Sequence, residues 1–163
     1  MTRLASVVRT FVVLLSVAMV PAVLPSGAAV AGEAKAAIPG THRLALQISD
    51  NDPQKMNTVL NVAANVSRLY AERGQEVEVK IVAFNAGLHM LREDTAPEGV
   101  KKRVHGFAKS MPNVSFAACN NTIQGMAKKE GKTPPLVNNA EIVPAGVVTL
   151  IELDEAGWTI VRP

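Results

Sequence analysis

Short apolar segments alternate with longer amphipathic ones along most of this chain, and this alternation constrains its fold more than any other feature. The segments 43–48, 77–84, 114–118, 141–143 and 158–161 are short, largely apolar and bounded by turn residues, which is typical of strands. Most are separated by stretches whose apolar residues recur every three or four positions. Strands that alternate with helices predict parallel β-α-β units. We expect an α/β fold, a flavodoxin-like or Rossmann-like three-layer sandwich with a mainly parallel sheet of about five strands.

The helices are predicted from start and stop signals. Asp52 before Pro53 predicts a helix start, and Gly74 predicts its end. Val66 and Tyr70 extend the apolar stripe of this helix. Further helices are expected over 98–110, over 121–129 and from Pro144 onward, the last with an apolar face that contains Val147, Leu150 and Ile151.

Residues 1–31 have the layout of a secretory signal peptide. Arg3 and Arg9 precede an apolar run from Thr10 to Leu24, and Ala29-Val30-Ala31 supplies the small residues of a cleavage site. The run falls short of the roughly 20 residues of a membrane span, so we expect no stable span after cleavage. An uncleaved N-terminal anchor is the alternative. The prediction is cleavage after Ala31, a linker over 32–41, a single domain over 42–163, and a periplasmic or secreted location.

The charge of the mature chain is close to balanced. Of the 17 Lys and Arg residues, two leave with the signal peptide, so 15 stand against 14 Asp and Glu. A basic cluster remains at Lys101, Lys102, Arg103 and Lys109, and we interpret it as a solvated helix face. The composition therefore favours no nucleic-acid partner.

Cys119 is the single cysteine. An exported chain with one cysteine has no internal disulfide, so the thiol is buried, paired between chains or used chemically. Cys119 lies between a predicted strand end and a predicted helix start, where backbone N–H groups favour a thiolate nucleophile. The alternative is a cysteine buried as packing, because the preceding Ala117 and Ala118 are typical of a core.

Polar residues follow the predicted strands, and a parallel sheet brings them to one edge. They include Asn85 and Gly87 after the second strand, and Asn120 and Thr122 beside Cys119. We predict that these four shape a substrate pocket around a catalytic Cys119, with Asn121 or Thr122 capping the following helix.

No cofactor or metal is predicted. His42, His89 and His105 show no metal-ligand spacing, although His89 could approach the site as an acid or base. The chain has no P-loop and no Ser-His-Asp order. Nucleotide or other small-ligand binding at the strand ends is a third, weaker possibility.

The segments that begin at His42, Val82, Phe116 and Val143 read HRLALQISD, VAFNAGL, FAACNNT and VPAGV. In this order and spacing they resemble the DsrE/DsrF-like family of sulfur-relay proteins, in particular its exported branch. The resemblance covers the chain from about His42 to the C-terminus.

The resemblance implies a flavodoxin-like fold and assembly into a homotrimer or homohexamer. It also implies that a cysteine, here at the position of Cys119, accepts sulfane sulfur as a persulfide and passes it to a partner thiol. Some relatives carry Cys-x-x-Cys at this turn, whereas this chain has Thr122 in the second place. A resolving thiol must then come from a partner protein or a small sulfur compound. The expected function is a periplasmic sulfur carrier, and the alternative is a non-catalytic oligomeric binding module.

Overall fold

Five parallel strands form the centre of the structure, a computed structural model that describes residues 41–163. The strands are β1 (His42–Ile48), β2 (Val77–Ala83), β3 (Val114–Cys119), β4 (Ala140–Val143) and β5 (Thr159–Val161). Their order in the sheet is β4-β3-β2-β1-β5, and every neighbouring pair is parallel. The expected signal peptide and the linker up to residue 40 lie outside the described residues.

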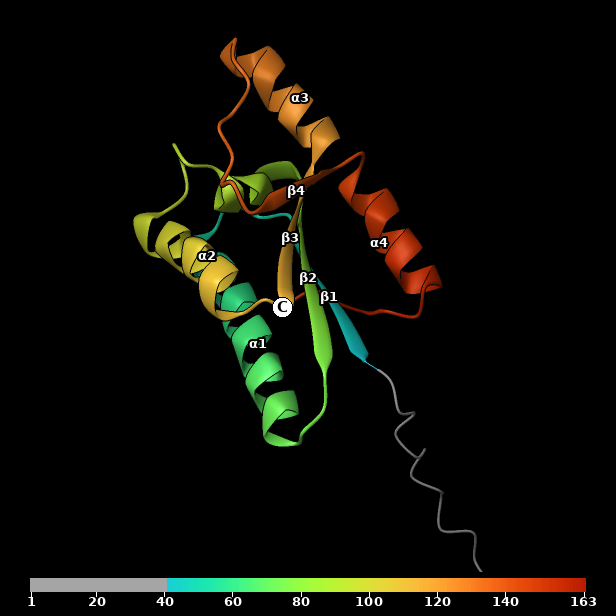
Figure 1. The fold of residues 1–163 in the computed structure, drawn as a ribbon. Helices are drawn as coiled ribbons and strands as arrows, with labels where there is room; N and C mark the ends of the chain where they lie inside the picture. Colours follow the sequence, from blue (N-terminus) through green and yellow to red (C-terminus); the bar gives the residue numbers. More distant parts are fainter. Residues whose placement is uncertain (1–40) are drawn as a thin grey trace, which may run out of the picture. The chain divides into compact units, whose positions relative to one another are not determined.

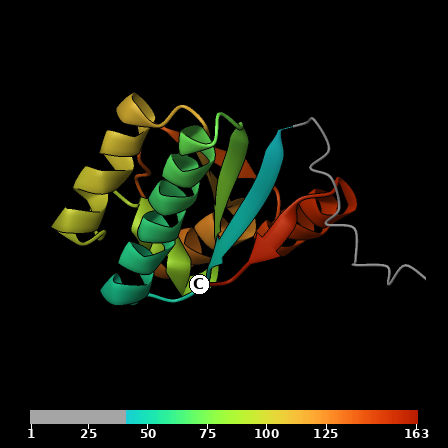
Figure 2. The same ribbon diagram turned by 90° about the horizontal axis from the view of Figure 1, so that it is seen from below.

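Helices cover both faces of this sheet. They are α1 (Pro53–Glu72), the 3-10 helix η1 (Asn85–Leu91), α2 (Glu98–Ser110), α3 (Asn120–Glu130) and α4 (Gly146–Glu155). Helices α1 and α2 lie on one face and α4 on the other, while α3 extends beyond the end of β3 (Figure 1). Figure 2 shows the same layers from below. The flavodoxin-like three-layer sandwich expected from the sequence is therefore confirmed. No helix within residues 41–163 has both the length and the apolar character needed to cross a membrane.

Helix α1 begins where the sequence predicts. The side chain of Asp52 accepts a hydrogen bond from the N–H of Gln54 at 2.8 Å, and Pro53 occupies the first turn. The buried stripe ends differently from the prediction, because Ser67 is buried while Val66 and Tyr70 are only partly covered.

Two apolar clusters hold the layers together. The larger joins α1, α2 and η1 to the sheet and includes Leu46, Ile81 and Phe116. The smaller joins α4 to the opposite face through Ala45, Val82, Ala117, Val143 and Leu150. Alternate residues of a strand point to opposite faces, which is why Leu46 and its neighbour Ala45 belong to different clusters.

The predicted apolar face of α4 was wrong in part. Leu150 is buried as expected, but Val147 and Ile151 are exposed, and Thr149 is buried in their place. Apolar residues occupy several sides of α4, so their spacing did not identify the side that meets the sheet.

Candidate functional site

The candidate site lies where the chain leaves β3 and β4 toward opposite faces of the sheet. After β3, helix α3 packs through Ile123 against the cluster of the α1–α2 side, whereas α4 after β4 packs through Leu150 on the other side. Connections that diverge in this way open a crevice at the carboxyl ends of the two strands.

A cavity of about 510 Å³ occupies this crevice. Three segments line it: the turn after β2, most of α3 with the residue before it, and the start of α4. The lining residues are Phe84, Asn85, Ala86, Cys119, Asn121, Thr122, Gly125, Met126, Lys129, Ala145, Gly146 and Val147.

Cys119 is both the last residue of β3 and the N-cap of α3. It is 5% exposed and lines the cavity. Among the described residues it belongs to neither of the two apolar clusters. Cys119 therefore lies in the wall of a crevice lined by both polar and apolar residues, and in neither apolar cluster.

The pKa of the Cys119 thiol is lowered below its ordinary value of 9.0. Burial raises this pKa, but hydrogen bonding from the hydroxyl of Thr122 and from the backbone N–H groups of Gly146, Thr122 and Asn121 lowers it by more in total. The donors come from the first turns of two helices, and no side chain of the described residues caps either helix. These N–H groups thus remain directed at the sulfur and favour the thiolate.

Asn85 connects the β2 turn to this donor set. Its backbone N–H donates to the Thr122 hydroxyl at 2.9 Å, which leaves the hydroxyl proton for the cysteine sulfur. Asn85 has a φ of 49°, a left-handed conformation that asparagine tolerates better than most residues.

The structure brings three of the five predicted site residues to the cavity: Asn85, Cys119 and Thr122. Asn120 is the first residue of α3 but is not among the lining residues. The expected cap at Asn121 or Thr122 is wrong, because α3 starts one residue earlier and Cys119 itself is the N-cap, without a side-chain cap bond.

Gly87 is also absent from the cavity lining. A Cβ atom at this position would lie 2.2 Å from the carbonyl oxygen of Ile48. Gly87 thus allows η1 to pack against the end of β1, and it acts on the site through the backbone.

Sequence reasoning did not identify Gly146, Met126 and Lys129 as cavity residues. Met126 and Lys129 share one face of α3 with Thr122, at helical spacing, and this spacing was the available signal. A Cβ atom on Gly146 would lie 2.9 Å from Cβ of Phe84, so glycine allows α4 to start close to the cavity.

The histidines take no part in this cavity. Nδ1 of His89 lies 2.7 Å from the hydroxyl of Thr95, and His105 pairs with Glu93 at 3.0 Å. Within residues 41–163, no three His, Cys, Asp or Glu side chains are grouped so as to hold a metal ion.

Fold and cavity together define a class: a parallel α/β sandwich with an ionisable cysteine at the carboxyl edge of its sheet. No protein-family model matches the chain, and no curated protein gives a significant match. A similar solved structure is that of MTH1491 from Methanobacterium thermoautotrophicum, described as a protein of unknown function. It is 25% identical, has a TM-score of 0.57, and the match covers 75% of this chain and 99% of that one. The likeness supports the fold.

Proposed function

We propose that this chain is a sulfur-handling protein of the DsrE/DsrF-like type, in which Cys119 accepts sulfane sulfur and passes it to a partner thiol. The observation that carries the proposal is the cysteine that lines a cavity while helix N–H groups lower its pKa. A signal peptide over residues 1–31 would place this activity in the periplasm or outside the cell.

The proposed step needs no oxidant or reductant. The Cys119 thiolate attacks the outer sulfur of thiosulfate, a new sulfur–sulfur bond forms, and the donor bond breaks to release sulfite. The protein then holds a persulfide anion. A partner thiolate attacks its outer sulfur in turn and regenerates the Cys119 thiolate.

The cavity fits a small anionic donor such as thiosulfate or a polysulfide. Of the described residues that line it, Lys129 is the one cation and none is a carboxylate. Two helix starts add N–H groups and the positive ends of their dipoles. An anion is therefore attracted to the same place as the nucleophile.

The proposed transfer ends on another molecule. Thr122 occupies the place where a second cysteine would resolve the persulfide, and Cys119 is the only cysteine in the chain. The acceptor must therefore supply its own thiol.

Intact mass measurement tests the proposal. The mature protein is incubated with thiosulfate or polysulfide, weighed, and weighed again after addition of glutathione. We expect wild type to gain the mass of one sulfur atom and to lose it to glutathione, whereas Cys119→Ser gains nothing. No added mass on wild type, or equal addition to Cys119→Ser, would reject the sulfur-carrier function.

A second candidate is a non-catalytic oligomeric binding module in which Cys119 is packing. The low exposure of Cys119 favours it, as do the exposed apolar residues Ile142, Val147, Val148 and Ile151 on β4 and α4. Assembly into a homotrimer or homohexamer through this surface is compatible with both candidates. A thiol that reacts with an alkylating reagent only after denaturation would favour the second.

A further inference from the structure

A buried arginine ties the two segments that form one side of the cavity. Arg92 follows η1 and is 1% exposed. Among the described residues it is the largest side chain that is fully buried. A guanidinium group in such a position is stable only with charged partners that replace its water. The partners of Arg92 show what it holds together.

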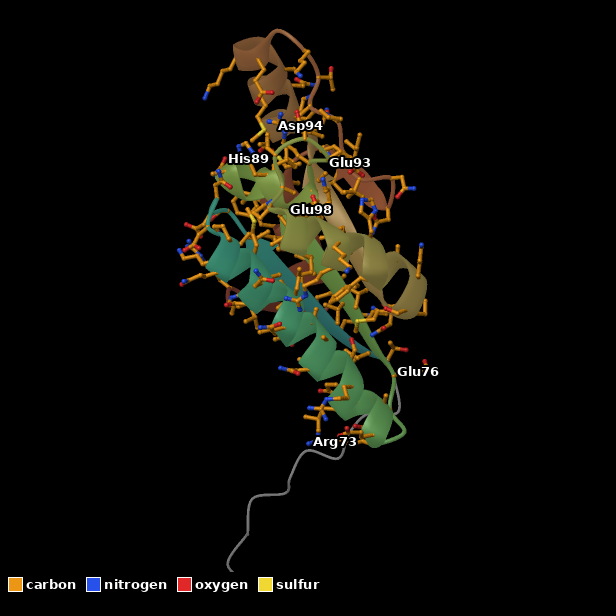
Figure 3. All side chains as sticks on the ribbon, turned by 90° about the vertical axis from the view of Figure 1, so that its left-hand side faces the viewer. Arg73, Glu76, His89, Glu93, Asp94 and Glu98 are labelled. Atoms are coloured by element: carbon orange, nitrogen blue, oxygen red, sulfur yellow. The ribbon has the colours of Figure 1, made fainter. Side chains whose placement is uncertain are left out.

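Arg92 binds two carboxylates through paired contacts. Its Nε and Nη2 donate to Asp94 at 2.9 Å each, and its Nη1 and Nη2 donate to Glu130 at 2.6 and 2.8 Å. Asp94 is a near neighbour in sequence, whereas Glu130 is the last residue of α3. In Figure 3, Asp94 lies at the end of the domain from which α3 extends, far from Arg73.

The same guanidinium reaches the cavity wall. Nη1 of Arg92 lies 3.6 Å from the sulfur of Met126, and Met126 lines the cavity. Arg92 thus touches α3 in its second turn and at its last residue, while Asn85 at the other end of η1 bonds Thr122 in the first turn. The segment from Asn85 to Arg92 therefore fixes α3 at both ends.

Helix α3 has little else to hold it. Ile123 is its one buried residue, Met126 packs partly buried against the same apolar cluster, and the helix projects past the sheet (Figure 1). Both apolar contacts lie in the first two turns of α3, so its last turn needs a separate anchor.

We propose that Arg92 is a positioning residue of the Cys119 cavity, which holds α3 at the angle that keeps its first turn against the cysteine sulfur. The position that Arg92 gives to α3 does not depend on the proposed function. Only the use of the Cys119 sulfur in sulfur transfer rests on that function. A well-packed apolar contact would anchor α3 as firmly, but the paired ion contacts also fix its angle.

The experiment compares two interhelical arginines by titrating the cysteine thiolate through its ultraviolet absorbance, with Cys119→Ser as the blank. Arg92→Lys keeps the charge but loses the paired contacts. Arg103→Lys is the matched control, because Arg103 joins α2 to Asn57 and Asn61 of α1, away from the cavity. Thermal melting is recorded for each variant.

We expect the titration midpoint of Arg92→Lys to rise by about half a unit, which is roughly threefold less thiolate below the midpoint. Arg103→Lys should lower the melting temperature and leave the midpoint unchanged. Glu130→Gln, at a less buried position, should shift the midpoint in the same direction. If Arg92→Lys does not fold, the titration of Glu130→Gln tests the inference in its place.

Folded Arg92→Lys and Glu130→Gln proteins that titrate like wild type would overturn the inference. So would an equal shift in Arg103→Lys, because the effect would then be one of general stability. The titration uses no sulfur donor, so its outcome is independent of whether Cys119 accepts sulfur.

Discussion

At the scale of single residues, Cys119 owes its properties to backbone groups as much as to side chains. Its position between strand and helix could be predicted from sequence, because an apolar segment ends there and a polar one begins. The contribution of Gly146 could not be predicted, since it comes from a distant turn that meets Cys119 only in the folded sheet. The local pattern thus identified the cysteine and the part of the chain that supplies its α3 donors, but not the donor at the start of α4.

Thr122 gives the first prediction. Thr122→Val removes the hydroxyl that bonds the cysteine sulfur and keeps nearly the same volume, so we expect a higher thiol pKa and severalfold slower alkylation near neutral pH. Thr122→Ser keeps the hydroxyl and is the control. The rate of alkylation by iodoacetamide is measured for both variants. Equal rates would show that the Thr122 hydroxyl does not influence the Cys119 thiol.

Cys119 also links stability to pH. Its folded-state pKa lies below the ordinary 9.0, so ionisation stabilises the folded state. This contribution is fully present above pH 9.0 and is lost as pH falls through the folded-state pKa. The free energy of unfolding of wild type relative to Cys119→Ala should therefore rise with pH between the folded-state pKa and 9.0, and level off above 9.0. Urea unfolding at several pH values measures it, and a pH-independent difference contradicts it.

At the scale of elements, most helices and strands begin and end within a residue or two of their predicted positions. Strong local signals explain this, such as Asp52 and Pro53 at the start of α1. The weak point was orientation: α4 carries apolar residues on several sides, so periodicity did not show that Leu150 faces the sheet while Ile151 faces outward. The side of α4 that faces the sheet is determined by how the helix packs across the sheet in the folded domain.

Gly87 tests how closely η1 must approach β1. Gly87→Ala would bring a methyl group against the Ile48 carbonyl, and we expect a loss of about 3 kcal/mol in the free energy of unfolding. Gly106→Ala in α2 is the control, since nothing lies within 4 Å of its added Cβ, and it should stabilise the protein by up to about 1 kcal/mol. Denaturant unfolding compares them, and equal effects would show that the approach is not close.

At the scale of the whole domain, the sequence predicted a parallel sheet but not its strand order. Alternating strands and helices imply parallel pairing, whereas the jump from β4 to the far side of β1 leaves no local trace in the sequence. That jump sends α4 to the opposite face and so creates the crevice that contains Cys119. The cavity thus arises from the strand order, and the sequence predicted only the edge of the sheet at which it lies.

Assembly is predicted at the same scale. If β4 and α4 form the contact between copies, Ile151→Glu should convert the oligomer to monomer, because it places a charge within an apolar interface. Leu69→Glu on α1, a similarly exposed apolar residue away from that surface, should leave assembly unchanged. Native mass spectrometry reads both, and dissociation by Leu69→Glu alone would place the interface elsewhere.

The most direct test of the account is the rate at which iodoacetamide modifies the folded wild-type protein as a function of pH. The account predicts complete modification of Cys119 without denaturant, with a rate that rises through a midpoint below 9.0. A thiol that stays unmodified until the protein unfolds, or a midpoint at or above the ordinary thiol value, would contradict it.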